Sequence, residues 1–207
     1  NGRISDFFEK PKTPAEVEAM QVEPEVLESQ GLPPAGRTHL ASMGVYLFNG
    51  KVLRDLLSRT EAKDFGREII PQAIRDHRVY GYPFDGYWRD IGTIRSFYEA
   101  NLDLAEPLPK FNFYDEDRPI FTHARFLPGS KILASEVDHS ILCEGSIINR
   151  SRISRSIIGI RSRIGENSLI ERAFVMGADA FESQEALERN AAQGIPDIGI
   201  GRNCEIR

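Results

Sequence analysis

The chain has 207 residues, of which 41% are hydrophobic and 28% are charged, and it carries a formal net charge of −5. This composition is ordinary for a globular protein, and the length allows one or two domains. The acidic balance argues against general nucleic-acid binding, which needs a surplus of Lys and Arg. No apolar run approaches the roughly 20 residues of a membrane span, so no membrane partner is expected. Cys143 and Cys204 have no metal-ligand spacing, which favours free thiols in a reducing compartment.

The first half of the chain alternates predicted strands with predicted helices. Strands are expected over residues 3–8, 40–48 and 79–84, and helices over residues 15–20, 52–57 and 67–76. Such alternation indicates an α/β layer. The segment 106–119 is rich in proline and aromatic residues and predicts a linker, so we expect a first domain over residues 1–105.

The stretch Gly86–Thr93 contains the only Trp of the chain and places Asp90 just before a predicted helix. Thr93 is a good N-cap, and Ile94 and Phe97 begin the apolar face of that helix. A carboxylate in this position suits a metal ion that bridges phosphates. The alternative is that Asp90 only closes a turn ahead of a capped helix.

Beyond the linker the hydrophobic period changes. Isoleucines recur six residues apart in two sets, which are Ile141, Ile147 and Ile153, followed by Ile158, Ile164 and Ile170. This is a hexapeptide repeat of the parallel β-helix kind, in which the apolar positions stack into a continuous interior. We expect the β-helix domain over residues 120–207, with a helical insertion over 177–199 whose helix spans Gln184–Ala192.

Four stretches together resemble one family, glucose-1-phosphate adenylyltransferase (ADP-glucose pyrophosphorylase). They are Phe8-Glu9-Lys10-Pro11-Lys12, Leu40-Ala41-Ser42-Met43-Gly44-Val45-Tyr46, Asp64-Phe65-Gly66-Arg67-Glu68-Ile69-Ile70-Pro71 and Tyr87-Trp88-Arg89-Asp90-Ile91-Gly92-Thr93. The resemblance covers essentially the whole chain. It implies part of an α/β nucleotidyltransferase domain with a Rossmann-like mixed sheet, followed by a left-handed parallel β-helix.

The resemblance also implies a reaction and a site. The family converts ATP and glucose 1-phosphate into ADP-glucose and pyrophosphate with Mg²⁺, in glycogen or starch biosynthesis. By resemblance, Lys10 binds the sugar phosphate, Glu9 accepts hydrogen bonds from glucose hydroxyls and Ser42 contacts the sugar. Asp90 is then one of two metal-binding aspartates, and Asp90 and Lys10 are the expected catalytic residues. The alternative is that Glu9 and Lys10 lie at a solvated strand end and that Ser42 is a core hydroxyl.

The chain departs from the family pattern at the nucleotide. It contains no glycine-rich phosphate loop, and it supplies only one of the two metal aspartates. We therefore expect a fragment of a longer protein that does not catalyse the reaction alone. The resemblance further implies a tetramer in the cytoplasm or a plastid, controlled by an anionic metabolite. Arg125 is the expected effector-binding residue and His123 a second candidate.

Two other functions are consistent with parts of the sequence. Hexapeptide coils also build acyltransferases, in which a histidine between coils acts as general base, and His139 is the only histidine within the repeat. Against this, more than half of the chain is predicted to be α/β. The other alternative is a regulatory or scaffold subunit of the same family that does not catalyse.

Overall fold

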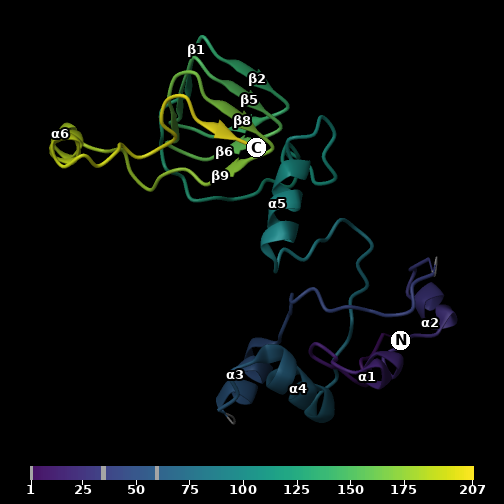
Figure 1. The fold of residues 1–207 in the computed structure, drawn as a ribbon. Coiled ribbons are helices and arrows are strands. Elements are labelled where there is room, and N and C mark those ends of the chain that lie inside the picture. Colours follow the sequence, from purple (N-terminus) through teal and green to yellow (C-terminus); the bar gives the residue numbers. More distant parts are fainter. Residues whose placement is uncertain (1, 34–35, 59–60) are drawn as a thin grey trace. The chain divides into compact units, whose positions relative to one another are not determined.

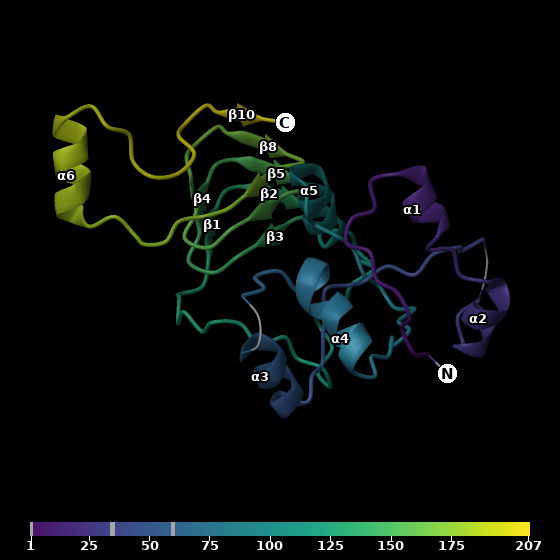
Figure 2. The same cartoon turned by 90° about the horizontal axis from the view of Figure 1, so that it is seen from below.

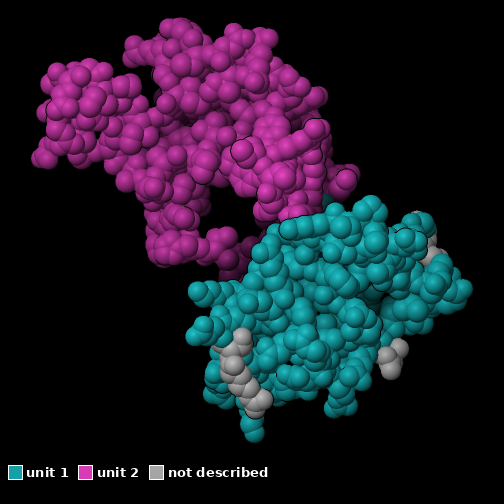
Figure 3. Space-filling view, turned by 60° about the horizontal axis from the view of Figure 1, so that its bottom comes forward, with its two compact units in different colours: residues 1–88 teal, residues 89–207 magenta. Residues whose placement is uncertain are grey.

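The computed structural model describes residues 2–33, 36–58 and 61–207. The chain divides into two compact units, residues 1–88 and residues 89–207, which are coloured separately in Figure 3. Among the described residues, no helix is long and apolar enough to cross a membrane.

The first unit is built on short helices (Figure 1). These are α1 (Pro14–Glu18), α2 (Pro24–Ser29), α3 (Gly50–Ser58), the π-helical turn η1 (Phe65–Ile69) and α4 (Ile70–Asp76). The predicted helices at 15–20, 52–57 and 67–76 are therefore confirmed within a few residues. Leu56, Ile69 and Ala73 form the buried core where α3, η1 and α4 meet.

The strands predicted in this unit are not formed as regular strands among its described residues. The segments 3–8 and 79–84 do lie antiparallel, through an isolated bridge between Arg3 and Tyr80 and a hydrogen bond from Ile4 N to Val79 O of 2.9 Å. The buried strand predicted over 40–48 is wrong here, because Val45 is 81% exposed and no β-ladder within the described chain includes this segment. An apolar run becomes a buried strand only where a neighbour satisfies its backbone groups.

The second unit contains three parallel sheets that form the walls of a prism (Figures 1 and 2). The first wall consists of β1 (Lys131–Leu133), β4 (Ile147–Asn149) and β7 (Arg163–Ile164). The second consists of β2 (Glu136–Asp138), β5 (Arg152–Ser154), β8 (Leu169–Glu171) and β10 (Glu205–Ile206). The third consists of β3 (Ile141–Leu142), β6 (Ile157–Ile158) and β9 (Phe174–Val175). The predicted β-helix is therefore confirmed, and buried isoleucines fill its interior.

The repeat is not a uniform six residues. Before the insertion, successive coils are offset by 16 or 17 residues, so that Ile132 pairs with Ile148 and Ile153 pairs with Ile170. Ile148 is a core residue with Leu142 packed against it, so the predicted interior positions Ile141 and Ile147 are wrong by one residue. The spacing could not distinguish them, because each is followed by a second large apolar residue.

A ladder of buried serines runs beside this apolar core. Its members are Ser146, Ser151, Ser156, Ser162 and Ser168. In the middle of the ladder, Ser151 Oγ donates to Gly165 O at 2.6 Å and accepts from Ser168 N at 3.2 Å. The hydroxyls therefore satisfy backbone groups at the corners, where the strands end and the sheet ladder cannot.

Two helices accompany the coils. Helix α5 (Ile94–Asp103) begins at Thr93, whose side chain accepts a hydrogen bond from Ser96 N, so the predicted N-cap is confirmed. It packs on the β-helix, where Phe97 meets Phe174 edge to face at 5.1 Å. Helix α6 (Gln184–Ala192) is confirmed at its predicted bounds and stands apart from the coils (Figures 1 and 2).

Candidate functional site

Three of the sequence motifs meet within the first unit. Gly66 lies against Glu9 so closely that a Cβ atom at Gly66 would clash with the Glu9 carboxylate, reaching Cδ at 2.9 Å. The absence of a side chain at Gly66 therefore makes room for the Glu9 carboxylate. This contact joins the Phe8–Lys12 stretch to the Asp64–Pro71 stretch.

Aromatic contacts bring in the third motif. Phe65 stacks on Tyr46 with ring centroids 6.0 Å apart and an interplanar angle of 14°. Tyr46 Oη lies 3.4 Å from Ser42 Oγ, and Ser42 Oγ also accepts a hydrogen bond from Gly44 N at 3.2 Å. Gly44 has a φ of 70°, a left-handed conformation that glycine adopts without steric cost. A chain of contacts thus runs from Ser42 through the aromatic pair towards Gly66.

Lys10 sits at the open end of this arrangement. Its Nζ lies 3.8 Å from Glu9 Oε1, and its side chain is 80% exposed whereas that of Glu9 is 28% exposed. The backbone of Lys10 has a φ of 53°, which is uncommon for a residue with a side chain and is often found where function requires a particular geometry. An exposed ammonium beside a partly buried carboxylate offers one group for a phosphate and one for hydroxyl donors.

Asp90 lies in the second unit, so its predicted convergence with Lys10 stays a prediction. Its Oδ1 accepts a hydrogen bond from Gly92 N at 2.8 Å, and the residue is exposed. The described residues contain no group of three or more potential metal-binding side chains. A single carboxylate still fits Mg²⁺, which proteins commonly hold through one or two carboxylates together with substrate phosphates and water.

The expected effector residues, Arg125 and His123, are both exposed and lie in no helix or strand. Arg125 Nη1 donates to the backbone oxygen of His123 at 3.5 Å, a long contact. Their role in binding an anionic effector stays a prediction. His139, considered as a general base, pairs with Asp138 at 2.7 Å on an exposed corner of the coil.

Cys143 has no feature of a reactive thiol. Burial raises its pKa, and the neighbouring Glu144 adds to the effect. A raised pKa lowers the fraction of thiolate, which is the nucleophilic form.

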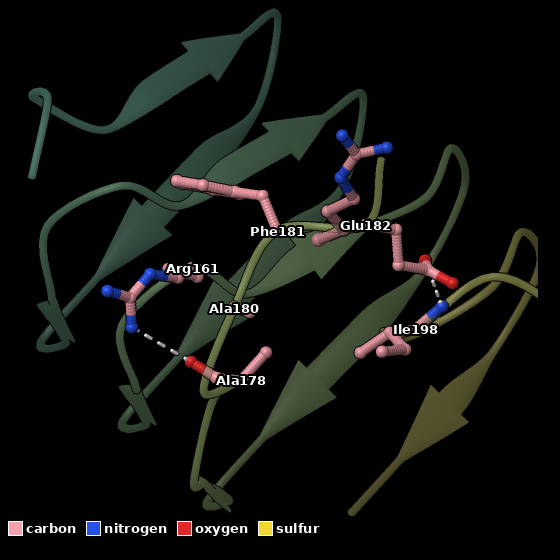
Figure 4. Close-up of a pocket in the computed structure, with 7 residues that line it drawn as sticks. Arg161, Ala178, Ala180, Phe181, Glu182 and Ile198 are labelled. Carbon is pink, nitrogen blue, oxygen red and sulfur yellow. Dashed lines mark hydrogen bonds between the residues drawn. The ribbon is translucent and has the colours of Figure 1, made fainter. Parts of the chain in front are cut away.

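A small hollow opens where the insertion leaves the coil (Figure 4). It is lined by Arg161, Arg163, Ala178, Ala180, Phe181, Glu182 and Ile198. Arg161 donates to Ala178 O at 3.3 Å and lies 5.8 Å from the ring centre of Phe181. Glu182 accepts from Ile198 N at 2.7 Å. The contacts of Arg161 attach the start of the insertion to the coil, and the Glu182–Ile198 hydrogen bond joins the two ends of the insertion to each other, so the hollow is best explained as a structural attachment.

Two family models match the chain. Residues 1–107 match the Nucleotidyl transferase model, and residues 125–207 match the model of the GLGC left-handed parallel beta-helix domain. Because the first match covers more than half of the 207 residues, the chain belongs to the nucleotidyl transferase family.

The second match narrows this class to a nucleotidyltransferase of the GlgC type. A nucleotidyl transferase domain followed by a left-handed β-helix is an ADP-glucose pyrophosphorylase-like architecture. The predicted resemblance and the predicted fold class are therefore confirmed.

Several residues of this arrangement were not found from the sequence. Phe65, Gly66 and Tyr46 belong to the family stretches 64–71 and 40–46, but no individual role was predicted for any of them. The aromatic residue beside a glycine at a helix start was the available signal. It could not indicate the contact partners, because these lie far away in the chain.

Proposed function

We propose that the chain carries the sugar-phosphate side of a glucose-1-phosphate adenylyltransferase. The observation that carries the proposal is the chain of contacts from Glu9 and Lys10 to Ser42, which passes from Gly66 through the stack of Phe65 on Tyr46. The family motifs that include these residues are far apart in sequence, and a shared substrate explains why they meet. The GlgC type of the two domains supports glucose 1-phosphate as that substrate.

In the proposed reaction, an oxygen of the sugar phosphate forms a bond to the α-phosphorus of ATP. The bond from that phosphorus to the β-phosphate oxygen breaks, and pyrophosphate leaves. Lys10 binds the sugar phosphate and offsets its charge, while Glu9 and Ser42 orient the sugar. Asp90 would hold Mg²⁺, which would supply positive charge at the phosphates. Assembly as a tetramer and control by an anionic metabolite at Arg125 and His123 belong to the same proposal.

Titration of the 207-residue chain with glucose 1-phosphate tests the proposal. We expect saturable binding that Lys10→Ala weakens by about tenfold or more, because a hydrogen-bonded charge contributes about 1.5–3 kcal/mol and 1.4 kcal/mol corresponds to tenfold. Lys12→Ala is the matched control, since it removes the same charge two residues away, and it should leave the affinity unchanged. Equal affinity in the wild type and Lys10→Ala would contradict the assignment.

The same titration separates the alternatives. A regulatory or scaffold subunit need not retain the sugar site, so absence of saturable binding would favour it. An acyltransferase that uses His139 would instead transfer an acyl group from an acyl thioester and would lose that activity in His139→Ala. The His139–Asp138 pair is exposed, and neither residue lines the hollow beside the insertion, so we favour the sugar-phosphate assignment.

A further inference from the structure

Arg89, the neighbour of Asp90, is held by two carboxylates of helix α5. Its Nη2 forms an ion pair with Glu99 Oε2, and its Nη1 lies 3.3 Å from Asp103 Oδ2. The Arg89 side chain is 31% exposed, so it is partly withdrawn from water. Such a two-sided anchor restrains a guanidinium better than a single surface pair, because both halves of its donor fork are engaged.

The helix that holds Arg89 is itself fixed. Phe97 packs against Phe174, and Tyr98 donates a hydrogen bond to the backbone oxygen of Arg172, so α5 is attached to the β-helix at two points. The Thr93 cap fixes the start of the helix. The ion pairs of Arg89 with α5 therefore attach Arg89 to the β-helix through that helix.

Asp90 lies in a short segment that is tied at both ends. Arg89 anchors the segment on one side, and the capped Thr93 anchors it on the other. Between them, Gly92 N donates to Asp90 Oδ1 at 2.8 Å, while Oδ2 has no hydrogen-bond partner among the described residues. One oxygen of Asp90 is thus oriented by backbone, and the other remains available to a ligand.

We infer that Arg89 is a positioning residue for the Asp90 carboxylate, which it holds ready for a divalent cation. This inference rests on the proposed function, in which Asp90 binds Mg²⁺. Because Glu99 and Asp103 engage the Arg89 charge, Arg89 does not neutralise Asp90. A carboxylate whose backbone is restrained loses less conformational freedom on binding a cation, so the cation binds more tightly.

The test uses Mn²⁺ as a paramagnetic probe in the full 207-residue chain and follows broadening of the backbone amide signal of Gly92. We expect Arg89→Gln to raise the half-saturating Mn²⁺ concentration by about tenfold, at the lower end of the usual effect of residues that orient metal ligands. Arg89→Lys keeps the charge but cannot hold both carboxylates, and it should fall between the wild type and Arg89→Gln. Far-UV circular dichroism verifies that α5 persists in each variant.

Arg95→Gln is the matched control. Arg95 also forms an ion pair with Glu99, at 2.8 Å, but it lies in α5 itself, four residues before Glu99, and its side chain is exposed. If only charge mattered, both Arg89→Gln and Arg95→Gln would strengthen cation binding, because each removes a positive charge. If Arg89 positions Asp90, only Arg89→Gln should weaken cation binding. Unchanged or tighter Mn²⁺ binding in a folded Arg89→Gln variant would overturn the inference.

Asp90→Asn distinguishes this inference from the proposed function. If broadening at Gly92 persists in Asp90→Asn, the metal role of Asp90 fails and the inference fails with it. If Asp90→Asn abolishes the broadening while Arg89→Gln leaves it unchanged, only the positioning role of Arg89 is refuted.

Discussion

Replacement of Gly66 by alanine should weaken the binding of glucose 1-phosphate while changing the stability of the fold little. The added Cβ would clash with the Glu9 carboxylate and would lie 3.3 Å from its Cγ. What it meets is the far end of a flexible side chain, so Glu9 can rotate away at small cost. Alanine is also better than glycine in a helical turn by roughly 0.5–1 kcal/mol, which offsets part of that cost. We therefore expect the free energy of unfolding to change by no more than about 1 kcal/mol.

The affinity should respond differently. A displaced Glu9 can no longer accept hydrogen bonds from the sugar, and a hydrogen bond to a charged group contributes about 1.5–3 kcal/mol. Loss of one such bond corresponds to a dissociation constant about tenfold higher or more. Calorimetric titration with glucose 1-phosphate and urea denaturation of the same preparations measure the two quantities.

Gly50→Ala is the control for this experiment, because a Cβ at Gly50 would meet nothing within 4 Å. It should leave the affinity unchanged and, because Gly50 is the first residue of α3, should raise the free energy of unfolding by no more than about 1 kcal/mol. The reasoning is refuted if Gly66→Ala binds glucose 1-phosphate as the wild type does while Glu9→Gln binds it more weakly. That result would mean that Glu9 acts from a position that Gly66 does not control.

Two further predictions concern the second unit. Ser151→Ala should lower the free energy of unfolding by about 2 kcal/mol, because it leaves a partly buried carbonyl and a buried amide of the next coil without their partner. The control is Ser154→Ala, whose side chain has no hydrogen bond to any described residue and whose loss should change the free energy of unfolding by less than about 0.5 kcal/mol. Urea denaturation followed by circular dichroism compares the two variants, and equal losses would contradict the role of the serine ladder. A hydrogen bond from Arg95 is the largest of the effects that hold the pKa of Glu99 below its ordinary value, so Glu99 contributes stability that is present above the ordinary carboxyl pKa and is lost as pH falls through the lowered pKa. The melting temperature of Glu99→Gln should therefore fall less on acidification than that of the wild type, and parallel pH profiles would exclude this contribution.

Local signals predicted those parts of the fold that form locally. The caps and apolar spacing of α5 and α6 determine helices without reference to the rest of the chain, and both were found. The repeat predicted the β-helix, because stacked coils place equivalent residues at regular intervals. The strand predicted over residues 40–48 is wrong for the opposite reason. A strand depends on a partner that composition does not specify, and here no ladder forms along it.

The candidate site shows the same division between local and distant information. Glu9 and Lys10 were predicted as substrate-binding residues from the sequence. The contact of Glu9 with Gly66 was not predicted, because it joins distant parts of the chain and produces no periodic pattern in the sequence.

The anchor of Arg89 did leave a trace in the sequence. Glu99 and Asp103 are four residues apart, so they lie as like charges on one face of α5, an arrangement that destabilises an isolated helix. Such a pair is tolerated where a cation binds between the two carboxylates, and Arg89 does so. Since Arg89 immediately precedes Asp90, this unfavourable pair of charges was an available sequence signal, not used in the sequence analysis, for the positioning role that we propose for Arg89.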